Sequence, residues 1–476
     1  MDYQTDINEI ISFINEALPE DAADYRNCLD RFTTDINEQF LQERADYIKT
    51  QIEINKELQG AFARLAVFCR GKEKQCDQCV VRKYCNLYIK RARKKANGEA
   101  LHMVDLFCGA GGLSLGFSQE GFVTALANDI EPCCVDTYAH NHPETPMDHI
   151  VLGDIRNVMD HLEELLKDEK IDIVVGGPPC QGFSMANRQR LIDDPRNQLY
   201  KNYVEIVNRI RPVFFVMENV KGMLSVADQV KEDFREIGYS VECHILNAKD
   251  FGVPQNRERL IYIGNRIGVD NEKVFKEIFT LSQSTSEYVL GDAIYGLRPL
   301  EASRVKNSTE QGSEISGYRI EKNTTNSTNE YIEYINQGRK CPLTLNHKAR
   351  YNNDRDIEIF GRMFQGDKSD DPKIADIMPY ARRHGIFRDK YFKLEEKKLC
   401  KTITAHMKFD CNMYIHPTQA RGLTPREAAR VQSYPDDYYF RGAYTKTYMQ
   451  IGNSVPPLLG RAIAHVVKKY IDRGHE

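Results

Sequence analysis

The segment GGPPCQGFS, Gly176 to Ser184, carries the side chain best suited to covalent chemistry. It follows the apolar run IDIVV, and two prolines fix the backbone directly before Cys180. A thiolate presented on such a rigid loop can act as a nucleophile. The ordinary alternative is a buried structural cysteine, but a Pro-Pro-Cys-Gln-Gly loop is poorly suited to burial. We therefore interpret Cys180 as a nucleophile.

Two further motifs place charged groups close to other apolar runs. In MENV, Glu218 ends a predicted strand, where a carboxyl group can hold or donate a proton to a polar heterocycle. In QNRERL, Arg257 and Arg259 are two residues apart and therefore lie on one side of an extended segment. They could bind an anion or orient a base, and a surface salt bridge is the alternative for either arginine.

A glycine-rich turn, DLFCGAGGLSLGF, follows a predicted strand and opens a predicted helix. Gly109 and Gly111 would let a ligand approach the backbone at the helix N-terminus, as in cofactor-binding turns of α/β proteins. The next strand ends at Asp129, about 20 residues further on, where a carboxylate could accept hydrogen bonds from ribose hydroxyls. Asp154 follows the third strand, and helix capping is an equal alternative for each acid.

These groups must be positioned by the elements around them, and the chain of 476 residues is long enough for two or three domains. From His102 to about Asn265, short apolar strands alternate with helical stretches such as Asn197–Arg211. This rhythm predicts an α/β fold with a doubly wound, mostly parallel sheet. Polar tracts in 266–400 predict an irregular domain. A capping box of Thr424 and Glu427 then begins a helix, and a final helix ends near Gly474.

The N-terminal part of the chain contains a separate cysteine cluster. Residues 5–68 have helical periodicity, and they precede four cysteines spaced C-x6-C-x2-C-x5-C: Cys69, Cys76, Cys79 and Cys85. Four thiolates suit either a [4Fe–4S] cluster or zinc. The spacing resembles the iron–sulfur loop of helix-hairpin-helix DNA glycosylases, so we expect a [4Fe–4S] cluster, with zinc as the alternative.

Charge is unevenly distributed around this cluster. Residues 1–50 contain 12 acids and 4 bases, whereas residues 69–95 contain 10 bases and 2 acids. The basic run predicts a contact with DNA phosphates next to the cysteine loop. A solvated basic face is the alternative interpretation.

Taken in order, the motifs of the rest of the chain resemble the DNA cytosine-5 methyltransferase family. The resemblance covers about 102–265 and 415–465, and it includes GGPPCQGFS, ENV, QNRERL, RGLTPREAARVQSYPDD and IGNSVPP. It implies a Rossmann-like enzyme that depends on S-adenosylmethionine. It also implies a catalytic domain at 101–265, a target-recognition domain at 266–415, and a segment at 416–476 that completes the catalytic domain. The helical periodicity and the cysteine loop add a helical N-terminal domain at 1–98.

The resemblance also implies roles for individual residues. The thiolate of Cys180 would add to C6 of a cytosine extruded from the DNA stack. Glu218 would interact with N3 and the exocyclic amine, and Arg257 would help to hold the flipped base, with Arg259 in the same motif. At position 130 the family often has an aromatic residue, whereas this chain has Ile130. The implied cofactor pocket is lined by Phe107, Gly109, Gly111, Asp129, Ile130, Asp154, Ile155, Leu199 and Asn453.

We expect the substrate to be a specific sequence in double-stranded DNA, read by the segment 266–415. A restriction–modification role with a cognate endonuclease is the expected setting. Two alternatives stay open, namely an RNA (tRNA) cytosine-5 methyltransferase and a non-catalytic DNA-binding redox sensor. The sequence contains no apolar run of about 20 residues and no secretory signal. We therefore expect a cytoplasmic, nucleoid-associated prokaryotic protein with no membrane partner.

Overall fold

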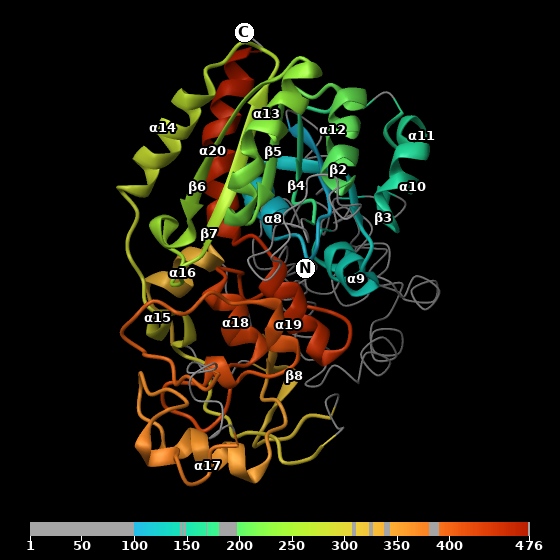
Figure 1. The fold of residues 1–476 in the computed structure, drawn as a ribbon. Coiled ribbons are helices and arrows are strands. Elements are labelled where there is room, and N and C mark those ends of the chain that lie inside the picture. The colour runs from blue at the N-terminus through green and yellow to red at the C-terminus, as the bar shows by residue number, and fades with distance from the viewer. Residues whose placement is uncertain are drawn as a thin grey trace, which may run out of the picture.

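The computed structural model describes residues 100–142, 145, 149–167, 169–179, 198–306, 311–322, 327–337, 343–379 and 390–474. The predicted N-terminal helices, the four clustered cysteines and Cys180 lie outside these ranges. The described chain forms an α/β lobe above a second lobe of short elements (Figure 1).

A seven-stranded sheet forms the centre of the α/β lobe, with strand order β3-β2-β1-β4-β5-β7-β6. Strands β1 to β5 pair in parallel, and β7 pairs antiparallel with both β5 and β6. The predicted doubly wound, mostly parallel sheet is therefore confirmed. The strand order reverses between β1 and β4, and ligands of such sheets bind at the carboxyl ends of the strands beside that point. The strands are β1 Leu101–Leu106, β2 Phe122–Asp129, β3 Ile150–Leu152, β4 Ile173–Gly176, β5 Phe214–Asn219, β6 Ser240–Asn247 and β7 Glu258–Asn265.

Helices cover both faces of this sheet, which is why its strands read as continuous apolar runs. In β4, Ile173 and Val175 join one core cluster, whereas Val174 joins the cluster on the opposite face. The first cluster includes residues of α8 (Gly112–Gln119), α14 (Asn271–Ser282) and α20 (Pro457–Gly474). The second includes residues of α10 (Ile155–Asp160), α11 (Leu162–Leu166), α12 (Gln198–Ile210) and α13 (Ala227–Glu236). Helix α9 (Pro132–Asn141) follows β2.

Helix α20 returns the end of the chain to the glycine-rich turn by packing on α8. A Cβ atom at Gly116 of α8 would lie 2.4 Å from the backbone nitrogen of Arg461, so only glycine permits this close approach. Glu120 then accepts a hydrogen bond of 2.8 Å from Nε of Arg461. The final helix ends at Gly474, as the sequence predicts.

The second lobe contains a two-stranded antiparallel sheet and several short helices. The polar tracts of this segment predict an irregular domain but not these two strands. In the α/β lobe, strand β6 was likewise not predicted. The elements are α15 Leu290–Ile294, β8 Gly317–Lys322, α16 Glu330–Asn336, β9 Leu343–Lys348, α17 Asp354–Arg362, η6 Pro372–Ile374, η8 Ala405–Lys408 and η9 Asn412–Tyr414. Two further short helices, η4 Lys221–Val226 and η5 Ala248–Phe251, belong to the α/β lobe.

Helices α18 (Pro425–Val431) and α19 (Tyr444–Asn453) lie where the two lobes meet (Figure 1). The predicted capping box of α18 is confirmed, because Glu427 accepts a 2.7 Å bond from the Thr424 backbone and its own backbone donates to Thr424 Oγ1. Arg421 binds both carboxylate oxygens of Glu427 at 2.7 Å. Burial alone would raise the pKa of Glu427, but the Arg421 guanidinium holds it below its usual value.

Among the helices of the described ranges, none has both the length and the apolar character needed to cross a bilayer.

Candidate active site

The glycine-rich turn after β1 has an unusual backbone that is tied to the end of β2. Phe107, Gly109 and Gly111 all have positive φ angles, of 57°, 53° and 80°. The amide of Gly109 donates to Oδ2 of Asp129 at 2.9 Å, and the amide of Glu131 donates to Oδ1 of the same carboxylate at 2.8 Å. A Cβ atom at Gly109 would meet nothing within 4 Å. The turn therefore borders open space at the carboxyl edge of the sheet.

Residues from the end of the chain support the turn from behind. The phenol of Tyr438 donates to the carbonyl oxygen of Ala110. A Cβ atom at Gly112 would lie 2.0 Å from Oγ of Ser454, so glycine is required for this contact. Asn453 directly precedes Ser454 and is exposed at the end of α19. The structure thus brings Asn453 next to the glycine-rich turn, although the two are more than 300 residues apart in sequence.

The other residues of the implied cofactor pocket are divided between the core and the surface. Phe107, Ile155 and Leu199 pack in or against the same apolar cluster beside β1 and β4. Ile130 directly follows Asp129 and is 65 % exposed, so its aliphatic side chain is open to a ligand.

The carboxylate of Asp154 caps a helix, which is the alternative role that the sequence left open for this residue. Its carboxylate caps α10 by accepting from the backbone of Arg156 at 2.9 Å, and the Arg156 guanidinium pairs with it at 2.9 Å. The hydrogen bonds from Arg156 lower the pKa of Asp154 to about 2. The cap places this carboxylate at the end of the loop that follows β3.

Glu218 lies at the end of β5 and faces the backbone that leads towards Cys180. Its Oε1 pairs with Nε of Arg259 at 2.6 Å. A Cβ atom at Gly177 would lie 2.8 Å from Oε2 of Glu218, so the carboxylate occupies the space that a side chain there would need. Asn219 Nδ2 donates to the carbonyl of Pro178 at 2.9 Å. MENV and GGPP therefore form one unit, whereas Cys180 itself lies outside the described residues.

Arg257, the first arginine of QNRERL, lies in the interior of the protein. Its side chain is completely buried, and its guanidinium donates to three backbone carbonyls: Ile403 at 2.7 Å, Gly452 at 2.9 Å and Ser454 at 2.7 Å. Burial lowers the pKa of Arg257 well below its usual value. In this structure the guanidinium therefore holds three backbone carbonyls in place. Of the two arginines in QNRERL, Arg259 is the one that contacts Glu218.

Two buried glutamines, which our sequence analysis did not single out, complete the framework. Gln255 donates to Oε1 of Gln432 at 2.6 Å and accepts from the backbone of Ile403 at 2.8 Å. Gln432 in turn donates to the carbonyl of Ile451 at 2.7 Å. Their signal in the sequence is weak, namely an uncharged polar residue in each of the motifs QNRERL and AARVQ. Together these bonds connect three motifs that are far apart in the chain.

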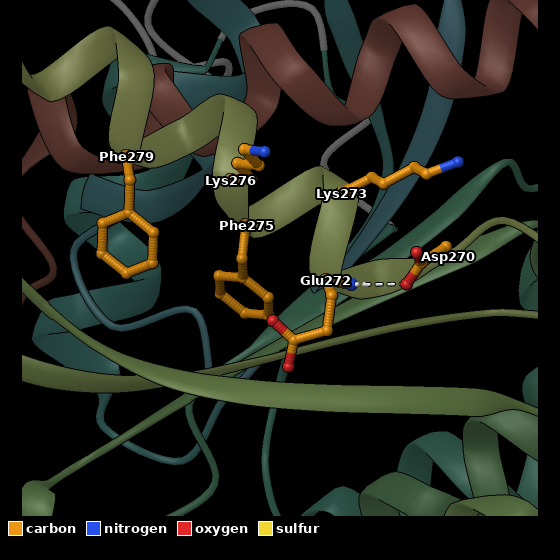
Figure 2. A pocket seen from close by; sticks show the side chains of 6 residues that line it. All are labelled: Asp270, Glu272, Lys273, Phe275, Lys276 and Phe279. Carbon is orange, nitrogen blue, oxygen red and sulfur yellow. Dashed lines mark hydrogen bonds between the residues drawn. The ribbon is translucent and has the colours of Figure 1, made fainter.

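A hollow along α14 lies away from these groups, at the edge of the sheet formed by β6 (Figure 2). Phe275 and Phe279 line it together with charged residues of α14, and His244 of β6 packs on Phe275 with ring centroids 4.5 Å apart. No predicted site residue lines this hollow.

Within the described ranges, no group of three or more His, Cys, Asp or Glu side chains is arranged to hold a metal ion. Cys69, Cys76, Cys79 and Cys85 lie outside those ranges.

The strand order, the left-handed glycine turn and the acidic ends of β2 and β5 define a Rossmann-like fold of the methyltransferase class. Within that class, residues 101–469 match the family model of the C-5 cytosine-specific DNA methylases. The chain belongs to this family, and it is a DNA cytosine-5 methyltransferase. The alternatives of an RNA-modifying enzyme and a non-catalytic sensor are not favoured.

Curated relatives agree with this assignment. The type II methyltransferase M1.HphI of Haemophilus parahaemolyticus is 36 % identical over 386 residues, which cover 78 % of this chain and 87 % of the relative. The type II methyltransferase M.DdeI of Desulfomicrobium norvegicum is 33 % identical over 399 residues, covering 78 % and 89 %. A solved prophage-encoded protein of Escherichia coli, assigned as a DNA modification methyltransferase, shares the fold with a TM-score of 0.60 at 24 % identity, covering 78 % of this chain and all of that one.

Proposed function

We propose that this chain transfers a methyl group from S-adenosylmethionine to C5 of a cytosine extruded from a specific sequence in duplex DNA. The observation that carries the proposal is the position of Glu218, paired with Arg259 above Gly177 at the end of the backbone leading to Cys180. The family and the type II relatives support a DNA-modification role. We further propose that the chain acts alongside a cognate endonuclease, on the nucleoid in a prokaryotic cytoplasm.

The residues at the glycine-rich turn fit a nucleoside cofactor. Gly109 borders open space, the exposed Ile130 offers an apolar surface to an adenine, and Asp129 keeps lone pairs for ribose hydroxyls after accepting its two backbone bonds. When bound, S-adenosylmethionine supplies an electrophilic methyl group. We assign its binding to the residues at positions that match the family's cofactor motifs: Phe107, Gly109, Gly111, Asp129, Ile130, Asp154, Ile155, Leu199 and Asn453.

Cys180, which follows β4 in the sequence, Glu218 near the end of β5 and Arg259 at the start of β7 would activate the cytosine. C5 of cytosine is a poor nucleophile, so the Cys180 thiolate adds to C6 and shifts electron density to C5. Glu218 holds a proton at N3 while negative charge builds in the ring, and Arg259 orients the Glu218 carboxylate. After the methyl group has been transferred, the C5 proton leaves and the thiolate is eliminated. The target must leave the base stack, because C5 and C6 are inaccessible inside a duplex.

We assign 101–265 and 416–476 to the catalytic domain and 266–415 to target recognition. For 1–98 we propose a domain whose [4Fe–4S] cluster, or alternatively zinc, is bound by Cys69, Cys76, Cys79 and Cys85 and shapes a basic DNA contact. The support is the cysteine spacing and the adjacent basic run. Replacing Cys79 with Ser should abolish the brown colour of the protein and weaken DNA binding. Unchanged DNA affinity in the cluster-free protein would exclude the DNA contact.

Bisulfite sequencing of plasmid DNA from expressing cells tests the proposed function directly. We expect protected cytosines in a single sequence context from the wild type and none from Cys180→Ala, which should still bind DNA and cofactor. Cys243→Ala is the matched control, because Cys243 is a half-buried cysteine on the edge strand β6. Methylation by Cys180→Ala at the wild-type level would contradict the assignment of the nucleophile. A folded wild type that protects no cytosine would contradict the proposed function itself.

A further inference from the structure

A segment of the second lobe, 402–410, runs directly alongside the candidate active site. Thr402 donates through Oγ1 to the carbonyl of Asn256 at 2.5 Å. Ile403 donates its amide to Gln255 at 2.8 Å, and its carbonyl accepts from Arg257 at 2.7 Å. The start of this segment is therefore anchored to QNRERL, the motif that also positions Arg259.

The other side of the segment is anchored next to Asn453. A Cβ atom at Gly452 would lie 2.2 Å from the carbonyl carbon of Thr404, so the two backbones are in direct contact. The helix η8 packs against α19 at this point. The segment 402–410 therefore contacts both the backbone next to Asn453 and the motif that contains Arg259. Its side chains lie close to the candidate active site.

An exposed aromatic ring projects from the end of this segment on a rigid backbone. Met407 is completely buried, whereas Phe409, two residues further on, is 66 % exposed. The guanidinium of Arg350 donates to the carbonyls of Met407 at 2.8 Å and of Phe409 at 2.9 Å. The amide of Phe409 also donates to the carbonyl of His406 at 2.9 Å. The ring is thus held outwards by its backbone, and ordering it on binding would cost little entropy.

The surroundings of this ring suit a polyanion. Nζ of Lys408 lies 4.9 Å from the centre of the Phe409 ring, and no ion pair joins Lys408 to a carboxylate in the part of the chain that the structure describes. His406 lies 5.3 Å away, ring centre to ring centre. The acid that follows Phe409 in the sequence, Asp410, is 4.0 Å from Nε2 of His406 and accepts a hydrogen bond from the backbone amide of Asn412. Single exposed apolar side chains are common, but this one combines a rigid backbone, a neighbouring cation and a place beside the active site.

From this combination we infer that Phe409 stacks on a base of the DNA substrate beside the extruded cytosine, while Lys408 contacts a phosphate. The inference rests on the proposed function. Extrusion of a base removes a stacking partner from its neighbours in the duplex, and apolar side chains commonly fill such a step. Stacking on an aromatic ring requires no particular base, so Phe409 would support binding and extrusion rather than select the sequence.

The composition of the chain makes this contact directly observable, because the sequence contains no tryptophan. Phe409→Trp introduces a unique fluorophore that can be excited apart from the tyrosines. We expect its emission to be quenched, and its accessibility to acrylamide to fall, when a duplex containing the bisulfite-determined site is added. Phe279→Trp is the matched control, since Phe279 is an exposed ring on α14 (Figure 2) that contacts His244 of the edge strand β6. Its emission should not respond to the duplex.

Binding affinities provide the second readout. Phe409→Ala should weaken duplex binding about 5- to 100-fold and leave the slope of affinity against salt unchanged. Lys408→Ala should reduce that slope by about 1. Unchanged Phe409→Trp emission in a complex verified by anisotropy, or an affinity of Phe409→Ala within about twofold of the wild type, would overturn this inference alone. A wild type that neither binds nor methylates duplex DNA would overturn the proposed function and this inference with it.

Discussion

The buried arginine of QNRERL offers a sharp test of the framework around the active site. Replacing Arg257 with Met removes the donors for the carbonyls of Ile403, Gly452 and Ser454, and a buried carbonyl without a donor costs about 1–3 kcal/mol. The substitution also removes a buried donor, Nε of Arg257, that has no hydrogen-bond partner among the described residues. This gain offsets part of the cost of the three carbonyls. Methionine fills most of the volume, so we expect a net loss of about 3 kcal/mol in the free energy of unfolding.

The assay is urea unfolding followed by circular dichroism, with methyl transfer measured on the same preparations. Arg461→Met is the matched control, because Arg461 is one-third exposed and its pair with Glu120 should contribute at most about 1 kcal/mol. If Arg257 instead held an extruded base, Arg257→Met would unfold at the wild-type urea concentration and lose only its activity. That result would refute the conclusion that this guanidinium serves as a buried clamp.

Further predictions concern the carboxylate at the end of β5 and a buried histidine. Gly177→Ala should displace the Glu218 carboxylate and reduce methyl transfer at least tenfold without unfolding the protein, whereas Gly361→Ala, whose added methyl group meets nothing within 4 Å, should leave the rate unchanged. Burial lowers the pKa of His347 from 6.5 to about 4, so the unfolded chain binds more protons between these values and stability falls as the pH drops through this window. Between pH 7 and pH 5, protonation of this histidine in the unfolded chain should lower the free energy of unfolding by about 2 kcal/mol. The test compares the pH dependence of the unfolding midpoint for the wild type and His347→Gln. The same pH dependence in both would contradict the lowered pKa of His347.

The sequence predicts the α/β fold well because the strands are buried on both faces. Their apolar runs are therefore continuous, and the helices between them keep their own periodicity. The start of α18 is predictable for a different reason, since Thr424, Pro425 and Glu427 act within a single turn. Edge strand β6 was missed because its residues are only partly buried and their pattern is mixed. Strands β8 and β9 lie among polar tracts and pair across a long connection, which no local pattern reveals.

The contacts of the candidate site were less predictable than its residue types. Glu218 is marked as chemically important by its place at the end of a strand, but nothing local shows that Gly177 must be glycine to leave room for its carboxylate. Spacing alone also assigned equivalent positions to the two arginines of QNRERL. The structure separates them, because the segment that covers Arg257 comes from residues about 150 and 200 positions further along the chain.

This separation explains how distant segments determine one catalytic geometry. Both Arg257 and Gln255 form hydrogen bonds with the backbone of Ile403. Arg257 also binds the carbonyl of Ser454 directly, at the end of α19, whereas Gln255 is connected to α19 through Gln432. Strand β7, which begins directly after Arg257, places Arg259 against Glu218. A shift of the segment at Ile403 therefore cannot leave the start of β7 unchanged, since both are parts of one buried hydrogen-bonded unit. Contacts that the second lobe makes with a substrate are consequently linked to the position of the Glu218 carboxylate through this unit.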